Sequence, residues 1–208
     1  MTEDPGCDAT KIEGLTAMEA VRRRPAMYVG DMQDPFLPAR LLMQALCHAA
    51  DCAMDGECSR VEIRIDGQDV EVEYDAGMPI DPEAGDADQA PLIFLSVNAG
   101  CHNRKRHLKV GDELCEIGLM VLNALSDRMT VTTSFSGWSA RYCFIKGLLI
   151  ERAPMTLDES NDRTSISFRL DHEILKDNTQ FDREFLEKKI KDIQGILPRM
   201  DVSIFSTT

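Results

Sequence analysis

The sequence contains no long hydrophobic run, and no apolar stretch approaches the ~20 residues that a helix needs to cross a bilayer. The first residues, Met1 to Asp8, are polar and acidic and lack the apolar segment of a secretory signal peptide. The seven cysteines are odd in number and irregularly spread, which is typical of reduced thiols rather than of a disulfide framework. These three observations predict a cytoplasmic protein.

Basic side chains are also scarce: the chain has 23 Lys and Arg against 36 Asp and Glu, for a formal net charge of -13. An acidic surface repels phosphate backbones and anionic lipid headgroups, so direct binding to nucleic acid or to a membrane is not expected. The one basic cluster, Arg104 to Lys109, could touch nucleic acid, but a solvated loop is the preferred interpretation. Any link to DNA is therefore expected to run through a protein partner.

Paired Cys-x-x-Cys spacing is absent as well, and with it the usual pattern of a structural zinc site. Two looser groupings could be imagined as soft-metal sites. They are Cys47, His48, Cys52 and Cys58, and Cys101, His102 and His107. We predict no metal site here and interpret the cysteines as small buried apolar side chains.

The chain has 208 residues, which suits one domain with a sizeable core. Residues 1–13 are predicted to be a flexible N-terminal arm, and residues 14–208 a single domain. Apolar periodicity predicts helices at 16–24, 39–54, 92–97, 117–125 and 182–197. Alternation and turn signals predict strands at 60–65, 69–74, 129–135, 138–146, 148–152, 164–170 and 201–205. This pattern favours an α+β two-layer sandwich, with helices on one face of a largely antiparallel sheet.

Four motifs in order carry a resemblance to a known family. They are the segment Ala20–Asp31 (AVRRRPAMYVGD), Asp75–Ile80 (DAGMPI), Val121–Ser126 (VLNALS) and the closing helix at 181–197. Together they resemble the N-terminal ATPase domain of type II topoisomerase B subunits, that is, of gyrase B and its topoisomerase IV counterpart. The resemblance spans about Gly14 to Phe205 and implies the GHKL, or Bergerat, fold, with helices against a mixed, largely antiparallel sheet.

The resemblance implies an adenine-binding end built on Asp75, whose carboxylate would accept a hydrogen bond from the exocyclic amino group of the base. Gly77 would allow close approach, Ile80 would form an apolar wall, and Thr164 would join the polar network. Arg141 corresponds to an arginine at the mouth of the family's pocket. From the residues alone, Asp-x-Gly is also an ordinary turn, and Arg141 is equally well an exposed arginine on a strand.

The resemblance also implies a catalytic face on the helix at 39–54, and here the sequence departs from the family. Gln44 stands where the family has the glutamate general base, and an amide cannot take up a proton near neutral pH. That contribution is typically worth ~10²–10⁴ in rate. His48 stands where an asparagine would offer oxygen to Mg²⁺, a cation that prefers oxygen ligands. Only Asp51 keeps the family's chemistry. Gln44 and His48 are therefore expected to be degenerate positions, and Mg²⁺ binding is doubtful.

The segment before the third motif would be the lid over the triphosphate. The family's glycine-rich turn wraps the phosphates with backbone amides, but residues 111–118 here read GDELCEIG. Asp112, Glu113 and Glu116 bring negative charge to the place where phosphates would lie. A like-charge contact at about 4 Å costs on the order of 1 kcal/mol in water-like surroundings. Triphosphate binding is therefore expected to be weak.

These departures predict a pseudo-ATPase: a stand-alone relative of the gyrase-B-type domain that acts through protein interaction or regulation and binds ATP or another adenine nucleotide weakly at most. The chain is not expected to be a topoisomerase by itself, because it stops where the family continues into further domains. One alternative is an active, divergent ATP-hydrolysing GHKL protein, with Asp51 or a relayed water as the base. Another is an interaction protein that pairs with topoisomerase B subunits. The sequence alone leaves open the partner, the oligomeric state and whether the pocket is filled by its own side chains.

Overall fold

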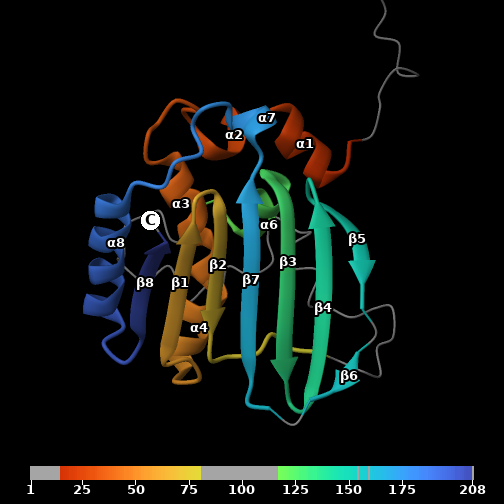
Figure 1. Ribbon diagram of the computed structural model, residues 1–208, viewed down its shortest axis with the longest axis vertical. Helices are drawn as coiled ribbons and strands as arrows, with labels where there is room; N and C mark the ends of the chain where they lie inside the picture. The colour runs from red at the N-terminus through yellow and green to blue at the C-terminus, as the bar shows by residue number, and fades with distance from the viewer. Residues whose placement is uncertain (1–14, 81–116, 154, 159, 208) are drawn as a thin grey trace, which may run out of the picture.

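The fold is built on one eight-stranded sheet, seen face-on in the computed structural model of Figure 1. The structure describes residues 15–80, 117–153, 155–158 and 160–207. The strands follow the order β5-β4-β3-β7-β2-β1-β8, and β6 pairs with β4. Their bounds are β1 (Arg60–Asp66), β2 (Asp69–Tyr74), β3 (Ser126–Phe135), β4 (Trp138–Ile145), β5 (Leu148–Arg152), β6 (Thr156–Leu157), β7 (Arg163–Leu170) and β8 (Asp201–Thr207). Only the β1–β8 pair is parallel among these described strands, so the sheet is mixed but largely antiparallel.

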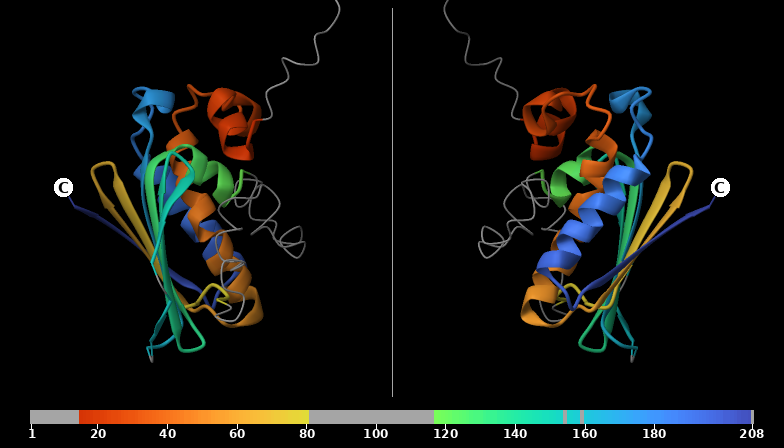
Figure 2. Two further views of the ribbon diagram at one scale, coloured as in Figure 1. Left: turned by 90° about the vertical axis from the view of Figure 1, so that its right-hand side faces the viewer. Right: turned by 90° about the vertical axis from the view of Figure 1, so that its left-hand side faces the viewer.

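The larger helices lie on one face of the sheet, as the two side views of Figure 2 show. The helical elements are α1 (Ala17–Arg23), α2 (Ala26–Val29), α3 (Leu37–Met43), the 3₁₀ turn η2 (Gln44–Leu46), α4 (Cys47–Asp55), α6 (Leu119–Ala124), α7 (His172–Leu175) and α8 (Arg183–Ile196). The expectation of an α+β two-layer sandwich is confirmed.

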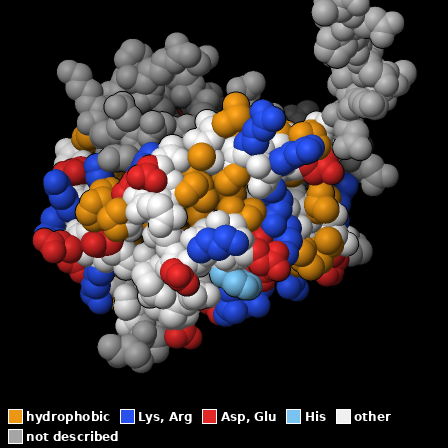
Figure 3. Space-filling model, turned by 90° about the horizontal axis from the view of Figure 1, so that it is seen from above, with side chains coloured by type: hydrophobic (Ala, Val, Ile, Leu, Met, Phe, Trp, Pro, Cys, Tyr) orange, Lys and Arg blue, Asp and Glu red, His pale blue; other side chains and the backbone are white. Residues whose placement is uncertain are grey.

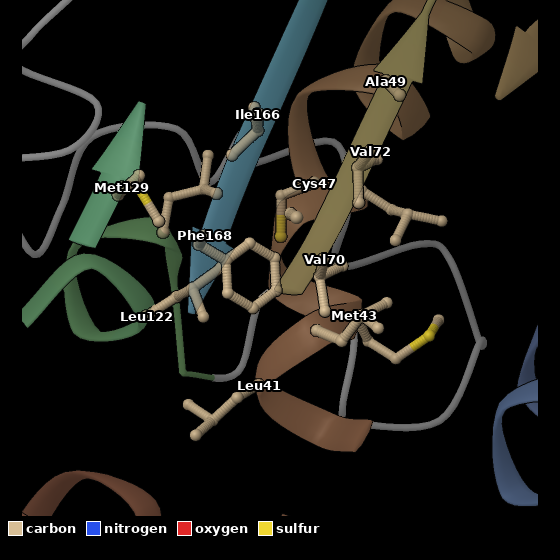
Figure 4. Packing of buried hydrophobic residues seen from close by; sticks show 14 of the residues in the cluster. Leu41, Met43, Cys47, Ala49, Val70, Val72, Leu122, Met129, Ile166 and Phe168 are labelled. Atoms are coloured by element: carbon tan, nitrogen blue, oxygen red, sulfur yellow. The ribbon is translucent and has the colours of Figure 1, made fainter. Parts of the chain in front are cut away.

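A single cluster of buried hydrophobic residues joins the two layers (Figure 4). Val70 and Val72 on β2 and Ile166 and Phe168 on β7 point from the sheet toward the helices. Cys47 of α4 is among the helix residues that meet them. The described residues therefore share one core. The limits of a single domain at 14–208, and the arm at 1–13, remain predictions.

Most predicted elements are found within a residue or two of their expected bounds. The strands predicted at 60–65 and 69–74 form a hairpin in which Asp66 pairs with Asp69. The helix predicted at 39–54 differs, since it begins at Leu37 and is interrupted by η2. The short elements α2, β6 and α7 were not predicted, because four or fewer residues cannot show a periodic pattern. The predicted helix at 92–97 and the basic cluster at 104–109 lie outside the described residues.

The first helix is held in place by one arginine from the AVRRRPAMYVGD segment. Thr16 and Glu19 form a capping box at the start of α1, which satisfies two of the free N–H groups there. Arg22 then donates to the carbonyl of Ala124 at 2.7 Å and to Asp171 Oδ2 at 2.6 Å. Asp171 has no exposed side-chain surface. Arg22 therefore joins α1 to α7 through a buried carboxylate and to α6 through a backbone carbonyl.

The surface and the thiols bear on two further sequence expectations. Of the described helices, none is long and apolar enough to cross a membrane. Seen from above, the end of the molecule that carries α1, α2 and α7 shows hydrophobic side chains among charged ones (Figure 3). Among the described residues, Cys52, Cys58 and Cys143 are free thiols, as expected for these three positions.

Candidate functional site

Gln44, which stands at the family's general-base position, is fully buried in η2. Its side-chain nitrogen donates to the carbonyl of Arg40 at 3.0 Å. Its side-chain oxygen accepts the N–H of Gly118, at the start of α6, at 3.0 Å. The amide therefore joins two helices and uses both its donor and its acceptor. A carboxylate here would keep the bond to Gly118 but would face the Arg40 carbonyl without a proton to donate.

His48 lies half-buried on α4 and faces the sheet rather than α6. Its Nδ1 is 3.1 Å from the hydroxyl of Tyr74 on β2, and the two ring centroids are 5.7 Å apart. Asp51, also half-buried, is on the same helix one turn later. Gln44 and His48 therefore contact different elements, α6 and β2, because η2 interrupts the regular helix between them.

Tyr74 takes the inward position at the end of β2, and it was not among the residues predicted for the site. Side chains alternate along a strand, and Val70, Val72 and Tyr74 are the buried ones on β2. The alternation was readable from the sequence, since Tyr74 follows Val70 and Val72 at two-residue spacing in the strand predicted at 69–74. Burial raises the pKa of its phenol well above the usual value, although a hydrogen bond with Thr164 acts in the opposite direction.

Asp75, the expected adenine ligand, follows Tyr74 and makes its contacts at the start of β1. Its Oδ1 accepts the backbone N–H groups of Ser59 and Arg60, each at 2.8 Å. Its Oδ2 accepts the hydroxyl of Ser59 at 2.5 Å. Asp75 lines a hollow of about 320 Å³ with Glu62 and Glu73, whose side chains alternate with the buried ones on their strands. These hydrogen bonds hold Asp75 to the start of β1 rather than to Gln44 or His48, and its adenine role remains a prediction.

These contacts make the charge of Asp75 part of the stability of the fold. Burial alone would raise its pKa, but the hydrogen bonds from Ser59 and Arg60 outweigh burial and lower the pKa from 3.8 to about 2. A lowered pKa stabilises the folded state above pH 3.8, and that stabilisation is lost as the pH falls toward 2. We expect the free energy of unfolding of Asp75→Asn to fall less steeply than that of wild type between pH 4 and 2. Urea titrations at several pH values measure this, and parallel curves would contradict it.

The segment that follows β2 and contains Gly77 crosses β3 and is hydrogen-bonded to the sheet there, in part by Thr164. The Thr164 hydroxyl donates to the carbonyl of Ala76 at 2.8 Å and lies 2.9 Å from the hydroxyl of Thr133. The Thr133 oxygen in turn accepts the N–H of Met78 at 2.7 Å. A Cβ added at Gly77 would lie 2.1 Å from the carbonyl oxygen of Ser134. The close approach at Gly77 is therefore to the backbone of β3.

The remaining predicted residues fall in different places. Ile80 is buried in the core, as an apolar wall residue would be. Arg141 is exposed on β4, pairs with Thr132 of β3 and alternates with the buried Tyr142, so it lies away from the helices. Of the predicted lid, only Ile117 and Gly118 are described. Within the described part of the chain, no group of three or more His, Cys, Asp or Glu side chains is placed to hold a metal ion.

Comparison with known proteins shows which proteins this chain is similar to. No protein-family model matches the chain. It is 28% identical to the B subunit of DNA gyrase from Campylobacter jejuni over 94% of its length. It is 29% identical to the B subunit of the type 2 topoisomerase from Aquifex aeolicus over 92%, and 30% identical to the gyrase B subunit of Chlamydia pneumoniae over 89%.

The chain spans only about a quarter of the length of these relatives, 26% of the first and 24% of the other two. The similarity nevertheless covers nearly the whole chain and agrees with the four motifs and with the α+β sandwich. The chain is therefore a homologue of the type II topoisomerase B subunits, and its resemblance to their GHKL ATPase domain is confirmed.

Proposed function

We propose that this chain is a gyrase-B-type domain that has lost ATP hydrolysis, binds triphosphate weakly at most and acts through contact with another protein in the cytoplasm. The observation that carries the proposal is the buried amide of Gln44, which bonds to Arg40 and Gly118. An amide at the base position cannot take a proton from water. The absence of a general base would lower turnover by a factor of ~10²–10⁴ relative to an enzyme that has one.

The helix face offers Mg²⁺ little in place of the missing oxygen ligand. His48 directs Nδ1 toward the Tyr74 hydroxyl, and Mg²⁺ prefers oxygen ligands in octahedral geometry. Asp51 is the one carboxylate at the positions compared with the family's catalytic face. A magnesium-bridged triphosphate therefore has few partners here, which supports weak binding without turnover.

Restoring the family's residues separates a pseudo-ATPase from a divergent active ATPase. Phosphate release with ATP and Mg²⁺ is measured for wild type, for Gln44→Glu and for the double variant Gln44→Glu/His48→Asn. We expect no turnover above background in any of them. We also expect Gln44→Glu to lose about 2 kcal/mol of stability, because the Arg40 carbonyl loses its donor and a charge is buried.

The matched control is Gln33→Glu, which makes the same chemical change at an exposed position and should leave stability within about 0.5 kcal/mol of wild type. Wild-type turnover that disappears in Gln44→Ala would overturn the proposal. A large gain in turnover in the double variant would show instead that only two side chains separate this chain from an active enzyme.

Homology to topoisomerase B subunits makes a protein of that kind a plausible partner. The acidic composition, with 36 acidic against 23 basic residues, argues against direct contact with DNA and favours contact through a protein. Mixing the purified chain with purified gyrase B or its topoisomerase IV counterpart and measuring mass by light scattering tests this partner. A mixture that elutes as the two separate components at concentrations near 50 times a micromolar Kd, about 50 μM, would remove this candidate.

A further inference from the structure

We infer that Tyr74 closes the purine end of this site from within the fold, so that no adenine base enters between β2 and α4. The inference deepens the proposed loss of hydrolysis and rests on it only in part. A site can lose turnover and still bind a base. Closure of the base end is a separate property with its own residues and its own test.

Tyr74 occupies the position where helix and sheet face each other at the end of β2. Any ligand that contacted both layers would have to lie between α4 and the inward side chains of this strand. The inward side chain at its end is Tyr74, which is only 2% exposed. Asp75 instead contacts Ser59 and Arg60 at the start of β1. The carboxylate expected to recognise the base is therefore displaced by one residue from the position that faces α4.

The phenol of Tyr74 joins the helix layer to the sheet. Its hydroxyl reaches His48 on α4 at 3.1 Å, and Tyr74 pairs across the sheet with Thr164 on β7. Tyr74 thus connects β2 to α4 through its phenol and to β7 through its backbone pairing. A purine that bridged helix and sheet would need the same space and the same partners. Because the phenol is part of the chain, its contact with α4 requires no ligand.

The polar groups that a base would need are already engaged with the protein. A 6-amino group needs an acceptor, and the Asp75 carboxylate is already held at the start of β1 by three hydrogen bonds from Ser59 and Arg60, so a base would have to share it with them. The Thr164 hydroxyl donates to the Ala76 carbonyl. A base that replaced Tyr74 would break the contact between the phenol and His48, leaving the half-buried imidazole with Cys52 among its remaining neighbours, and the loss of a hydrogen bond in a partly buried place is costly. The residues present therefore do not fit an adenine base.

Adenosine is the probe that isolates this end of the site, since it carries no phosphate and does not test the acidic residues of the lid. Wild-type protein is titrated calorimetrically with adenosine, ADP and ATP with Mg²⁺, and its melting temperature is measured with each at 1 mM. We expect no saturable heat and no shift in melting temperature for any of the three. Saturable binding of adenosine or ADP would overturn the inference, while the proposed loss of hydrolysis would still stand if no phosphate were released.

Two variants test whether the phenol is the cause. Tyr74→Ala empties the position, and we expect 1 mM p-cresol, which has the shape of the lost side chain, to raise its melting temperature and to leave wild type unchanged. Tyr74→Phe keeps the ring and loses the bond to His48, so it should be less stable than wild type and should not respond to p-cresol. An equal response of wild type and Tyr74→Ala to p-cresol would contradict an internal plug. If Tyr74→Ala does not fold, the wild-type titration with adenosine decides alone.

Discussion

Replacing Gly77 with alanine should destabilise the protein by about 3 kcal/mol, at the upper end of what an added methyl group costs in a packed region. The new Cβ would lie 2.1 Å from the carbonyl oxygen of Ser134 and 2.9 Å from Cβ of Phe135. The chain after β2 would have to leave β3. That movement would strain the bonds from Met78 to Thr133 and from Thr164 to Ala76. Denaturant titration measures the loss, which corresponds to a fall in melting temperature of roughly 10 °C.

The chain offers a matched control in Gly195, which is exposed in α8 and has nothing within 4 Å of an added Cβ. Alanine has the higher helix propensity, so Gly195→Ala should stabilise the protein by up to about 1 kcal/mol. If Gly77→Ala were as well tolerated as Gly195→Ala, the crossing over β3 would not have the tight packing described, and Gly77 would be kept for another reason.

Replacing Arg22 with alanine should cost about 3–5 kcal/mol, because removal of one partner leaves a buried charge uncompensated. Asp171 has no exposed side-chain surface, and Arg22 also holds the last carbonyl of α6, that of Ala124. Burial alone would raise the pKa of Asp171, but the bond from Arg22 and the N–H of Glu173 hold it below its usual value. Without Arg22 the carboxyl is expected to take up a proton at a higher pH. Urea titration at pH 7 gives the size of the effect.

Arg23 is the neighbour to compare, since it is exposed on the same helix. Arg23→Ala should change stability by less than about 0.5 kcal/mol. The difference between the two variants should persist at 1 M salt, because a buried pair is screened far less than an exposed one. Equal effects of Arg22→Ala and Arg23→Ala would mean that the bond to Asp171 does not anchor α1.

The sheet and the long helices could be predicted because their buried apolar residues recur at the spacing of a strand or of a helix. Val61 and Ile63 alternate on β1, and Leu186, Ile190 and Ile193 recur on α8. The 3₁₀ turn at Gln44–Leu46 could not be read from the sequence, because all three of its residues are buried and the turn therefore shows no exposed polar face. The order of the strands could come only from resemblance, since pairing between β3 and β7 depends on contacts distant in sequence.

The candidate site was predicted in its parts but not in its arrangement. Gln44 and His48 were identified as departures from the family, and the structure gives each a partner inside the fold. The motif gives the position of Asp75 in the sequence. The face of the sheet toward which a side chain points is instead decided by the alternation along the preceding strand, β2. Counting on from Val70 and Val72 assigns Tyr74 to the helix side. That residue carries the polar contact between α4 and β2.

The homology and the site lead to different conclusions about function. Sequence similarity to gyrase B and the shared fold support an ATP-binding type of domain, and fold alone does not establish an activity. The side chains between sheet and helices instead use their polar atoms on each other. Gln44 joins η2 to α6, Tyr74 joins β2 to α4, and Asp75 joins β2 to β1. These bonds stabilise the scaffold and leave few polar groups of the described residues for a nucleotide.

The most direct test of whether Tyr74 closes the site is a crystal structure of the protein. The crystals are grown with 5 mM of a non-hydrolysable ATP analogue and Mg²⁺. We predict that the hydroxyl of Tyr74 will still lie within hydrogen-bond distance of His48 Nδ1, with no base between β2 and α4. A purine ring stacked in that space, with Tyr74 turned away and Asp75 or Thr164 bonded to the 6-amino group, would contradict the account.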